Sequence, residues 1–234
     1  MMNRFIIALA LIFSFQNFLT AQTINQEDGN GHKQGKWVKT YQNGKIRYEG
    51  QFRDDMPYGE FHYYYESGKL KAVSKYSDDG VICKVSSFYE NGKPMAVGEY
   101  INQKKDGKWV FYSDIDGKMV TEETYSLDVL DGRKISYYPE TEKPMEIDYY
   151  EKGKEEGVFQ KFYTSGGAMV NGKYKNGELD GEYTVYYENG QVEIHGYYEK
   201  GIQIGNWEYF DENGKALSED EYKKQDKVEE KAPN

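Results

Sequence analysis

The sequence predicts an all-β protein, an elongated array of about eight β-hairpin repeats that together form a twisted antiparallel sheet. Three observations predict this. The sequence repeats with a period of 24 or 25 residues, each period contains a turn signal ending in glycine, and aromatic residues recur at fixed places within it. Repeats of this length are units that bury their apolar side chains only by stacking on their neighbours.

The first 21 residues have the layout of a secretory signal peptide. Arg4 supplies a basic start, residues 5–15 form an apolar run, and small residues lead up to Ala21. The apolar run is shorter than the roughly 20 residues that a membrane-spanning helix needs. We therefore expect export to the periplasm or the cell exterior, with an uncleaved N-terminal membrane anchor as the alternative. Residues 22–34 are polar and are predicted to form a linker.

Residues 35–217 contain the repeats. Each unit opens with a glycine, except the third, where Cys83 takes this place; the glycines are Gly35, Gly59, Gly107, Gly132, Gly157, Gly181 and Gly205. Two residues later a bulky apolar residue recurs, from Trp37 to Trp207, with Lys134 as the exception. Five residues after the opening position an aromatic residue recurs, at Tyr64, Phe88, Tyr112, Tyr137, Phe162 and Tyr186. Several columns that agree in this way indicate one repeated structural unit.

A turn signal lies in the middle of the unit. Asn-Gly occurs at 43–44, 91–92, 189–190 and 213–214, and this dipeptide favours a two-residue type I′ turn between antiparallel strands. Counting outward from such a turn pairs Trp37 with Gly50, Phe159 with Gly172, Tyr183 with Gly196, Tyr187 with Val192, and Gly35 with Phe52. Both glycine columns then face aromatic columns, so we expect rings to cover both kinds of glycine.

Alternation along a strand places the rings of Trp37 and Tyr41 on one face and the fifth-position ring on the other. A single hairpin is only marginally stable, so the units must pack on one another. One face is predicted to close a thin core while the other stays partly open. Because aromatic residues are enriched in interfaces, the six fifth-position residues from Tyr64 to Tyr186 are the predicted binding residues.

Two regions depart from the pattern. Between residues 117 and 156, two units each carry a one-residue insertion, and Thr141 stands near the place of the turn glycine. Pro139 and Pro144 cannot donate to a sheet, which predicts a bulge or kink there. After Leu217 the pattern stops, and residues 218–234 are predicted to form a charged C-terminal tail.

The stretches GKWVKTYQNGKIRYEGQF and GEYTVYYENGQVEIHGYY resemble the MORN repeat. They are closer to the MORN repeat variant of bacterial proteins similar to the YwqK antitoxin family. The resemblance extends over residues 35–217 and implies an elongated, twisted array of β-hairpins. It also implies two roles, an antitoxin that binds a toxin and a protein that contacts membrane phospholipids.

The charge of the chain limits its partners. The net charge is −10, and removal of residues 1–21, which contain Arg4 and no acidic residue, makes it −11. Nucleic-acid phosphates and anionic lipid headgroups repel such a protein. We therefore expect no nucleic-acid partner, and binding to a membrane surface is disfavoured. The single Cys83 excludes an internal disulfide bond.

The sequence contains no recognisable grouping of catalytic or metal-binding residues. His32, His62 and His195 lie in the linker and in distant units, whereas an acid–base or metal site needs groups that converge. Cys83 has no histidine nearby, and residues 114–118 match only part of a calcium loop. We therefore predict no enzymatic activity, no catalytic residues, no metal and no cofactor.

These observations predict an exported, non-enzymatic repeat protein that acts as a protein-binding scaffold in the periplasm or cell envelope. One alternative is a YwqK-like antitoxin that neutralises a cognate toxin by direct binding. The other is a carbohydrate-binding or membrane-surface module, because rings on a flat sheet can stack on sugars.

Overall fold

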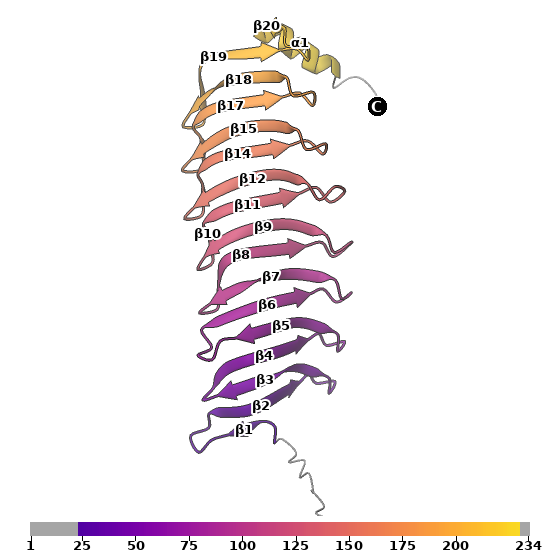
Figure 1. The fold of residues 1–234 in the computed structure, drawn as a ribbon, viewed down its shortest axis with the longest axis vertical. Coiled ribbons are helices and arrows are strands. Elements are labelled where there is room, and N and C mark those ends of the chain that lie inside the picture. Colours follow the sequence, from indigo (N-terminus) through magenta and orange to yellow (C-terminus); the bar gives the residue numbers. More distant parts are fainter. Residues whose placement is uncertain (1–22, 230–234) are drawn as a thin grey trace, which may run out of the picture.

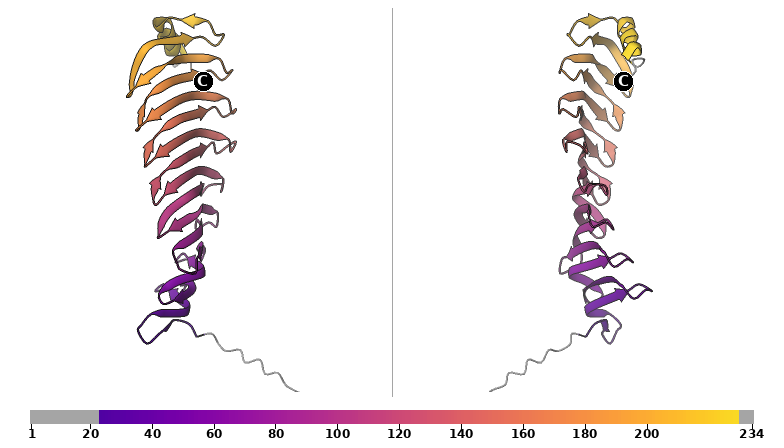
Figure 2. Two further views of the ribbon diagram at one scale, coloured as in Figure 1. Left: turned by 60° about the vertical axis from the view of Figure 1, so that its left-hand side comes forward. Right: turned by 90° about the vertical axis from the view of Figure 1, so that its right-hand side faces the viewer.

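The computed structural model of the protein describes residues 23–229. They form one long antiparallel sheet of 20 strands and a single helix (Figure 1). The sheet is open, one layer thick and twisted along its length (Figure 2). The predicted fold class is therefore confirmed. The expected signal peptide lies outside the described residues, and none of the helices within them is long and apolar enough to cross a membrane.

The strands follow one another in chain order as hairpins. β1 (Gln26–Glu27) lies at the outer edge of the first hairpin. The hairpins are β2 (Lys33–Thr40) with β3 (Ile46–Arg53), β4 (Met56–Tyr64) with β5 (Leu70–Tyr76), β6 (Ile82–Phe88) with β7 (Pro94–Ile101), β8 (Lys104–Tyr112) with β9 (Met119–Ser126), β11 (Gly132–Tyr137) with β12 (Pro144–Glu151), β14 (Gly157–Phe162) with β15 (Ala168–Lys175), β17 (Gly181–Tyr186) with β18 (Val192–Glu199), and β19 (Ile202–Phe210) with β20 (Ala216–Leu217). Short strands β10 (Val129–Leu130), β13 (Lys154–Glu155) and β16 (Glu178–Leu179) lie at the joints between hairpins, and α1 (Glu219–Glu229) ends the described chain.

The turn inside each hairpin differs from the predicted type I′ turn. In the first unit the amide of Gly44 donates to the carbonyl of Tyr41 at 3.0 Å, and the amide of Tyr41 donates to that of Lys45 at 2.8 Å. Only the glycine has a positive φ, of 81°, whereas Asn43 does not. This geometry is a type I turn followed by a glycine bulge, a three-residue loop. The prediction of a type I′ turn here was therefore wrong.

The bulge shifts the pairing beside the turn by one residue. Val192 lies opposite Tyr186 rather than Tyr187, because the register changes between Val185 and Tyr186. Farther from the turn the predicted pairs hold, since the extra residue is accommodated near the turn. The confirmed pairs are Trp37 with Gly50, Phe159 with Gly172, Tyr183 with Gly196, and Gly35 with Phe52.

Two-residue type I′ turns do occur, but they join one hairpin to the next. Asp54 and Asp55 link β3 to β4 with φ of 50° and 64°, and Arg53 pairs with Met56 across them. Asn102 and Gln103 repeat this arrangement between β7 and β8. A type I′ turn needs positive φ at both central residues, and these joint residues supply it without the Asn-Gly signature in most units.

The opening glycines create a bulge. Gly59 has a φ of 68°, and Gly59, Glu60 and Phe61 together face the single residue Gly50 of the previous strand. Residues other than glycine rarely adopt such a φ. A Cβ atom built at Gly35 or Gly59 would meet nothing within 4 Å. The prediction that a ring covers the opening glycines was therefore wrong; these positions require backbone freedom.

The second glycine column does lie under aromatic rings. A Cβ atom at Gly50 would stand 2.3 Å from the Phe61 ring, and one at Gly98 would stand 2.2 Å from the Trp109 ring. In both cases the ring belongs to the next hairpin, not to the residue paired in register. At Gly50 and Gly98 the bulge described above therefore presses the ring of one unit onto the bare backbone of the unit before it, whereas at Gly172 the nearest ring, 2.4 Å away, is that of Phe159 in the same hairpin.

Cys83 shows what happens when the opening glycine is absent. β5 and β6 pair without a register shift, from Ala72 opposite Ser87 to Tyr76 opposite Cys83. A β-strand without the bulge cannot press a large ring onto its neighbour. The apolar residue of this unit is correspondingly the smaller Val85, and Ser74 replaces glycine beneath it. Cys83 and Ser74 in place of glycines, and Val85 in place of a larger apolar residue, are therefore compatible with one another.

The middle of the array keeps the hairpin architecture despite its insertions. The loop from Ser113 to Lys118 and the loop from Tyr138 to Lys143 are each one residue longer than the others. Glu142, with a φ of 55°, takes the place of the turn glycine, rather than Thr141. The bulge between Ser136 and Tyr137 has counterparts in the neighbouring hairpins, so the two prolines produce no special kink.

Both segments beyond the repeats are structured. In the predicted linker, β1 pairs with β2, and the side-chain oxygen of Asn25 accepts from the amide of Val38 at 2.8 Å. In the predicted tail, the Ser218 hydroxyl accepts from the amide of Glu221, whose carboxylate accepts in turn from the amide of Ser218. This reciprocal capping box starts α1. The segment predicted as a polar linker thus contains β1 and the start of β2, and the segment predicted as a charged tail contains α1.

One face of the sheet, which we call the core face, contains most ring packing. Phe61, Trp109 and Phe159 are each at most 3% exposed. Phe61 meets Phe52 and Tyr76 with ring centroids 5.2 and 5.1 Å apart in edge-to-face contacts. Such pairs stabilise a core beyond simple burial by about 0.5–1.5 kcal/mol each. The apolar second-position residues therefore form the core, as the pattern predicted.

Candidate binding face

The six predicted binding residues lie on the face opposite the core, which we call the row face. Along β4, the rings of His62 and Tyr64 stack with centroids 6.5 Å apart, while Phe61 and Tyr63 stack on the core face. Equivalent positions continue along the array in Phe88, Tyr112, Tyr137, Phe162 and Tyr186, and all six side chains are half-buried. The structure therefore places the predicted residues in one row, two strands apart and about 10 Å from one to the next.

A ladder of tyrosine hydroxyls positions this row. Each sixth-position tyrosine donates to the carbonyl of the fifth-position residue in the following hairpin: Tyr41 to Tyr64 at 2.7 Å, Tyr65 to Phe88 at 2.7 Å, Tyr89 to Tyr112 at 2.9 Å, Tyr138 to Phe162 at 2.6 Å, Tyr163 to Tyr186 at 2.6 Å, and Tyr187 to Phe210 at 2.8 Å. Ser113 stands at this place before Tyr137, and its side chain is too short to reach. The sixth-position tyrosines, which form a repeat column in the sequence, thus link neighbouring units by hydrogen bonds.

The turns add a second link between units. The side-chain oxygen of Asn43 accepts from the amide of Lys45 at 3.0 Å, and its NH₂ group donates to the carbonyl of Glu66 at 3.0 Å in the next hairpin. Asn91 and Asn189 make the same two contacts. The asparagine of Asn-Gly is therefore used for these contacts, and not for a positive φ. Its meaning was missed because the turn type was misassigned.

The row differs in chemistry along its length. The Tyr64 hydroxyl donates to the carboxylate of Glu49 at 2.9 Å, and burial followed by this carboxylate raises the pKa of Tyr64. Burial and the nearby Glu122 likewise raise the pKa of Tyr137. Phe88 and Phe162 offer only apolar surface. The row thus presents two apolar rings among four phenols, a surface suited to mixed apolar and hydrogen-bonding contact.

A shallow hollow of about 350 Å³ lies on the row face between β5 and β8. Val73 and Val97 form its floor. Lys84 lies 3.9 Å from Glu99 and Lys108 lies 2.7 Å from Glu122, so its rim carries ion pairs. An apolar floor within a charged rim is typical of contact surfaces.

Several exposed apolar residues of the row face were not identified from the sequence. Tyr149, Val158 and Tyr197 are 45%, 54% and 47% exposed, and Ile204, directly opposite Tyr197, is 41% exposed. Tyr149 and Tyr197 occupy a column that in other units holds Gln, Lys, Glu or Thr. Two tyrosines at a repeat position that is otherwise polar could have been recognised in the sequence as candidate surface aromatics. These side chains extend the apolar surface of the row face toward the C-terminal end of the array.

Charged residues interrupt the core face in the middle of the array. Lys134 replaces the large apolar residue, and it lies directly opposite Asp148, which replaces the ring-covered glycine. Asp148 is 7% exposed. Burial, reinforced by Glu146, raises the pKa of its carboxyl to about 6, although Lys134 and Lys161 oppose the shift. The Glu146 carboxylate lies 3.0 Å from the Lys161 ammonium. This charged cluster faces away from the row.

The three histidines do not converge. His62 lies 3.3 Å from Glu60, and the Nδ1 atom of His195 lies 3.2 Å from the Thr184 hydroxyl. Cys83 is buried, which raises the pKa of its thiol. A buried thiol with a raised pKa is a poor nucleophile.

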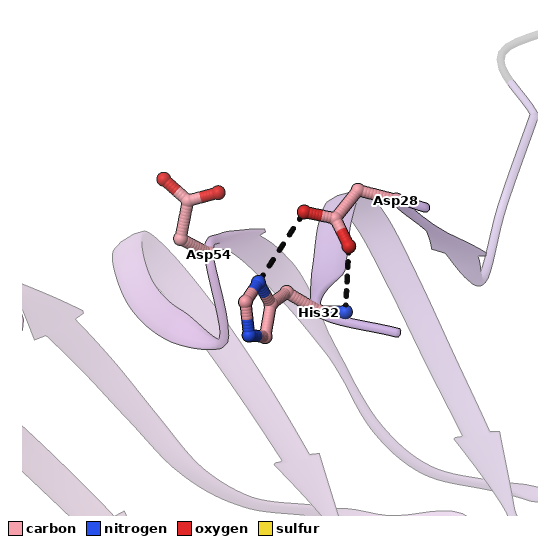
Figure 3. A group of neighbouring side chains, drawn as sticks. All are labelled: Asp28, His32 and Asp54. Atoms are coloured by element: carbon pink, nitrogen blue, oxygen red, sulfur yellow. Dashed lines mark hydrogen bonds and ion pairs between the residues drawn. The ribbon is translucent and has the colours of Figure 1, made fainter. Parts of the chain in front are cut away.

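His32 belongs to a surface group with Asp28 and Asp54, whose ligand-type atoms lie within 4.8 Å of one another (Figure 3). Its Nδ1 atom lies 3.3 Å from the Asp28 carboxylate, which also accepts from the amides of Asn30 and His32. Asp54 accepts from the Gln34 side chain at 2.6 Å. These contacts explain the position of each side chain. We therefore interpret the cluster as structural: it holds the loop that leads into β2 against the turn after β3.

Comparison with protein families matches the chain to the family described as MORN repeat variant, at residues 33–54, 57–82, 84–102, 179–200 and 203–224. No curated protein matches the chain. The segment between the third and fourth matches contains the longer loops and the Lys134–Asp148 substitutions, yet it folds into the same hairpins. The chain therefore contains five repeats of the MORN repeat variant family.

Proposed function

We propose that this protein is an exported, non-enzymatic scaffold that binds a protein partner through its row face in the periplasm or cell envelope. The observation that carries the proposal is the row itself. Six aromatic side chains recur at equal spacing on the face opposite the core, and a tyrosine ladder fixes the backbone of five of them. A rigid, half-buried aromatic surface favours binding because little conformational entropy is lost on association.

The chemistry of the row face supports a protein partner over other classes. Its rings alternate with carboxylates and ion pairs, such as Glu49 beside Tyr64 and Glu122 beside Lys108. An anionic lipid surface would be repelled by the net charge of −10. The exposed Tyr149 and Tyr197 add the amphipathic rings that protein interfaces favour.

A crosslinking pull-down from envelope extract tests this proposal, with residues 22–234 as bait. We expect the bait to recover one or a few proteins reproducibly, and a Tyr149→Ser/Tyr197→Ser variant to recover less of them. Both tyrosines are about half exposed, so the variant keeps its core. Recovery of no protein above the level of an unrelated acidic bait would contradict the proposal.

The antitoxin role implied by the family resemblance is a special case in which the partner is a toxin. Neutralisation of a toxin by the purified chain, lost in the same double variant, would support it. Carbohydrate binding is the competing class, since exposed rings also stack on sugars. A glycan array with signal abolished in the Tyr149→Ser/Tyr197→Ser variant, together with an empty pull-down, would favour carbohydrate binding instead.

A further inference from the structure

The last hairpin of the array is incomplete. β20 pairs only with Tyr209 and Phe210, and the chain then turns into α1. Among the described residues, no strand pairs with the stretch from Ile204 to Glu208 on the side away from β18. The amide of Asp211 donates to Lys215 across this hairpin. Because strand backbone groups alternate in direction, the amides and carbonyls of Trp207 and Gly205 also point to the open side.

This open edge lacks the charges found at the same place in every other unit. The other seven opening positions each have a charged residue directly before or after them, for example Asp106 and Lys108 around Gly107. Gly205 stands between Ile204 and Asn206. Ile202 and Ile204 are 69% and 41% exposed. Natural edges are normally protected by charged residues or prolines, so the exposed edge of β19 has the features of a pairing surface.

The complete hairpins show which residues fit this place. In all seven, the residue paired with the opening position is aromatic: Phe52, Tyr76, Tyr100, Tyr125, Tyr150, Tyr174 and Tyr198. Two residues earlier in that strand stands glycine in four units, and serine or a carboxylate in the others. By analogy, a strand that continues the sheet is expected to have a ring opposite Gly205, and glycine, serine or a carboxylate residue opposite Trp207.

The chain contains such a segment, but α1 removes it from the edge. Tyr222 stands 24 residues after Tyr198, and the family match extends to residue 224. In the structure the Tyr222 ring stacks on Tyr209 at 5.1 Å, and its hydroxyl donates to Glu193 at 2.6 Å. The Ser218 capping box holds the segment in the helix. The edge of β19 therefore stays available while α1 is folded.

We propose that the free edge of β19, from Ile204 to Glu208, binds an extended segment of a partner protein by strand addition. The segment pairs antiparallel, with glycine, serine or a carboxylate residue opposite Trp207 and an aromatic residue opposite Gly205. Backbone hydrogen bonds supply the affinity, and the ring supplies the specificity. This inference rests on the proposed scaffold function and adds a second surface, distinct from the row of fifth-position rings.

A capped peptide that copies residues 195–199, His-Gly-Tyr-Tyr-Glu, tests the proposal on the ¹⁵N-labelled chain of residues 22–234. In register, its glycine faces Trp207 and its second tyrosine faces Gly205. We expect the backbone amide signals of Gly205 and Trp207 to shift, with a dissociation constant of about 1 mM or lower. A peptide with serine in place of the second tyrosine should bind at least about fivefold more weakly, since the ring is lost.

Two N-methylated peptides provide the matched control. Methylation of the second tyrosine amide, which points toward β19, should weaken binding at least about fivefold, because it removes a backbone hydrogen bond. Methylation of the first tyrosine amide, which points to solvent, should leave binding unchanged. Equal binding of both peptides, or shifts confined to other residues, would overturn the proposal. So would an edge occupied by a second copy of the chain, seen as a dimer that the peptide does not perturb.

The failure of this inference can be told apart from failure of the scaffold function. The peptide experiment involves neither the row residues nor an envelope extract. A peptide that does not bind removes strand addition and leaves the pull-down result standing. If the peptide binds while the pull-down recovers nothing, strand addition at the edge of β19 is supported and protein binding through the row face is contradicted.

Discussion

At the scale of single residues, the two glycine columns have different physical reasons. The opening glycines supply a positive φ for the bulge, as at Gly59 with 68°. The second column makes room for a ring, as at Gly50 beneath Phe61. The sequence pattern revealed both columns but gave them one explanation, because spacing alone does not show backbone torsion. Ring contact could be predicted for the second column, whereas the bulge needed the structure.

Gly50→Ala tests the ring contact. A Cβ atom 2.3 Å from the Phe61 ring forces a shift, so we expect a loss of about 1–3 kcal/mol in the free energy of unfolding, measured by urea denaturation. Gly50→Ala/Phe61→Val recreates the pairing of a small side chain with valine seen at Ser74 and Val85. If the ring is the cause, alanine at position 50 should destabilise a Phe61→Val background much less than wild type. An equal loss in both backgrounds would contradict this explanation.

The buried carboxyl of Asp148 predicts a pH dependence. Its pKa of about 6 in the folded state lies above the ordinary value of 3.8, so the folded chain holds the proton more tightly than the unfolded one. Stability is therefore lost as pH rises from about 4 to about 6, by roughly 2–3 kcal/mol. Asp148→Asn should abolish this loss in urea denaturation series from pH 4 to pH 7.5. A stability difference between the Asp148→Asn variant and the wild-type chain that stays constant over this range would exclude the effect.

At the scale of elements, the hairpins are held together by recurring side-chain links as well as by strand pairing. The prediction of hairpins succeeded because apolar residues, glycines and turn signals all repeat in phase. The turn type was misassigned because Asn-Gly serves two geometries, and at residues 41–45 the asparagine caps the turn and donates to the next unit. α1 was missed although Ser218-x-x-Glu221 is a legible capping box.

Removal of one tyrosine hydroxyl of the ladder should weaken the packing between the two hairpins that it links. Tyr65→Phe deletes the 2.7 Å hydrogen bond to the carbonyl of Phe88, and we expect a loss of about 0.5–1.5 kcal/mol. Amide hydrogen exchange should accelerate in β4 to β7 more than in β17 to β19, because each hairpin packs mainly on its neighbours. Uniform acceleration along the whole array would show that the joints are not independent.

Ser218→Ala tests the capping box. The hydroxyl accepts from the Glu221 amide, and its loss should cost about 1 kcal/mol of helix stability. We expect the amide chemical shifts of residues 219–224 to move toward values of an unfolded or extended chain, while those of β2 to β18 stay unchanged. Helical shifts retained in full would show that packing of Tyr222 on Tyr209 is sufficient to hold α1.

At the scale of the whole molecule, an open single-layer sheet leaves two long faces and two edges for contact. The N-terminal edge is covered by β1 and Asn25, whereas the edge of β19 is exposed. The faces were predictable from alternation, and the six row residues lie on the face that alternation assigned to them. Their half-buried state was not predictable, because it depends on how far the twist of the sheet brings neighbouring units over each ring. The exposure of Tyr149 and Tyr197 depends on the same curvature.

The most direct measurement of the central claim is quantitative capture of the partner by two matched variants of residues 22–234. In the first, Phe88, Tyr112 and Phe162 of the row become serine; in the second, three exposed residues of the turns and joints, Met56, Ile115 and Leu127, become serine. Circular dichroism and urea denaturation establish that each variant is folded before the comparison. We expect a folded row variant to lose at least about 90% of capture, equivalent to about 1.4 kcal/mol or more, while the turn variant retains it. Capture unchanged in a folded row variant would contradict the claim, and a row variant that does not fold would assign those rings to the core instead of to binding.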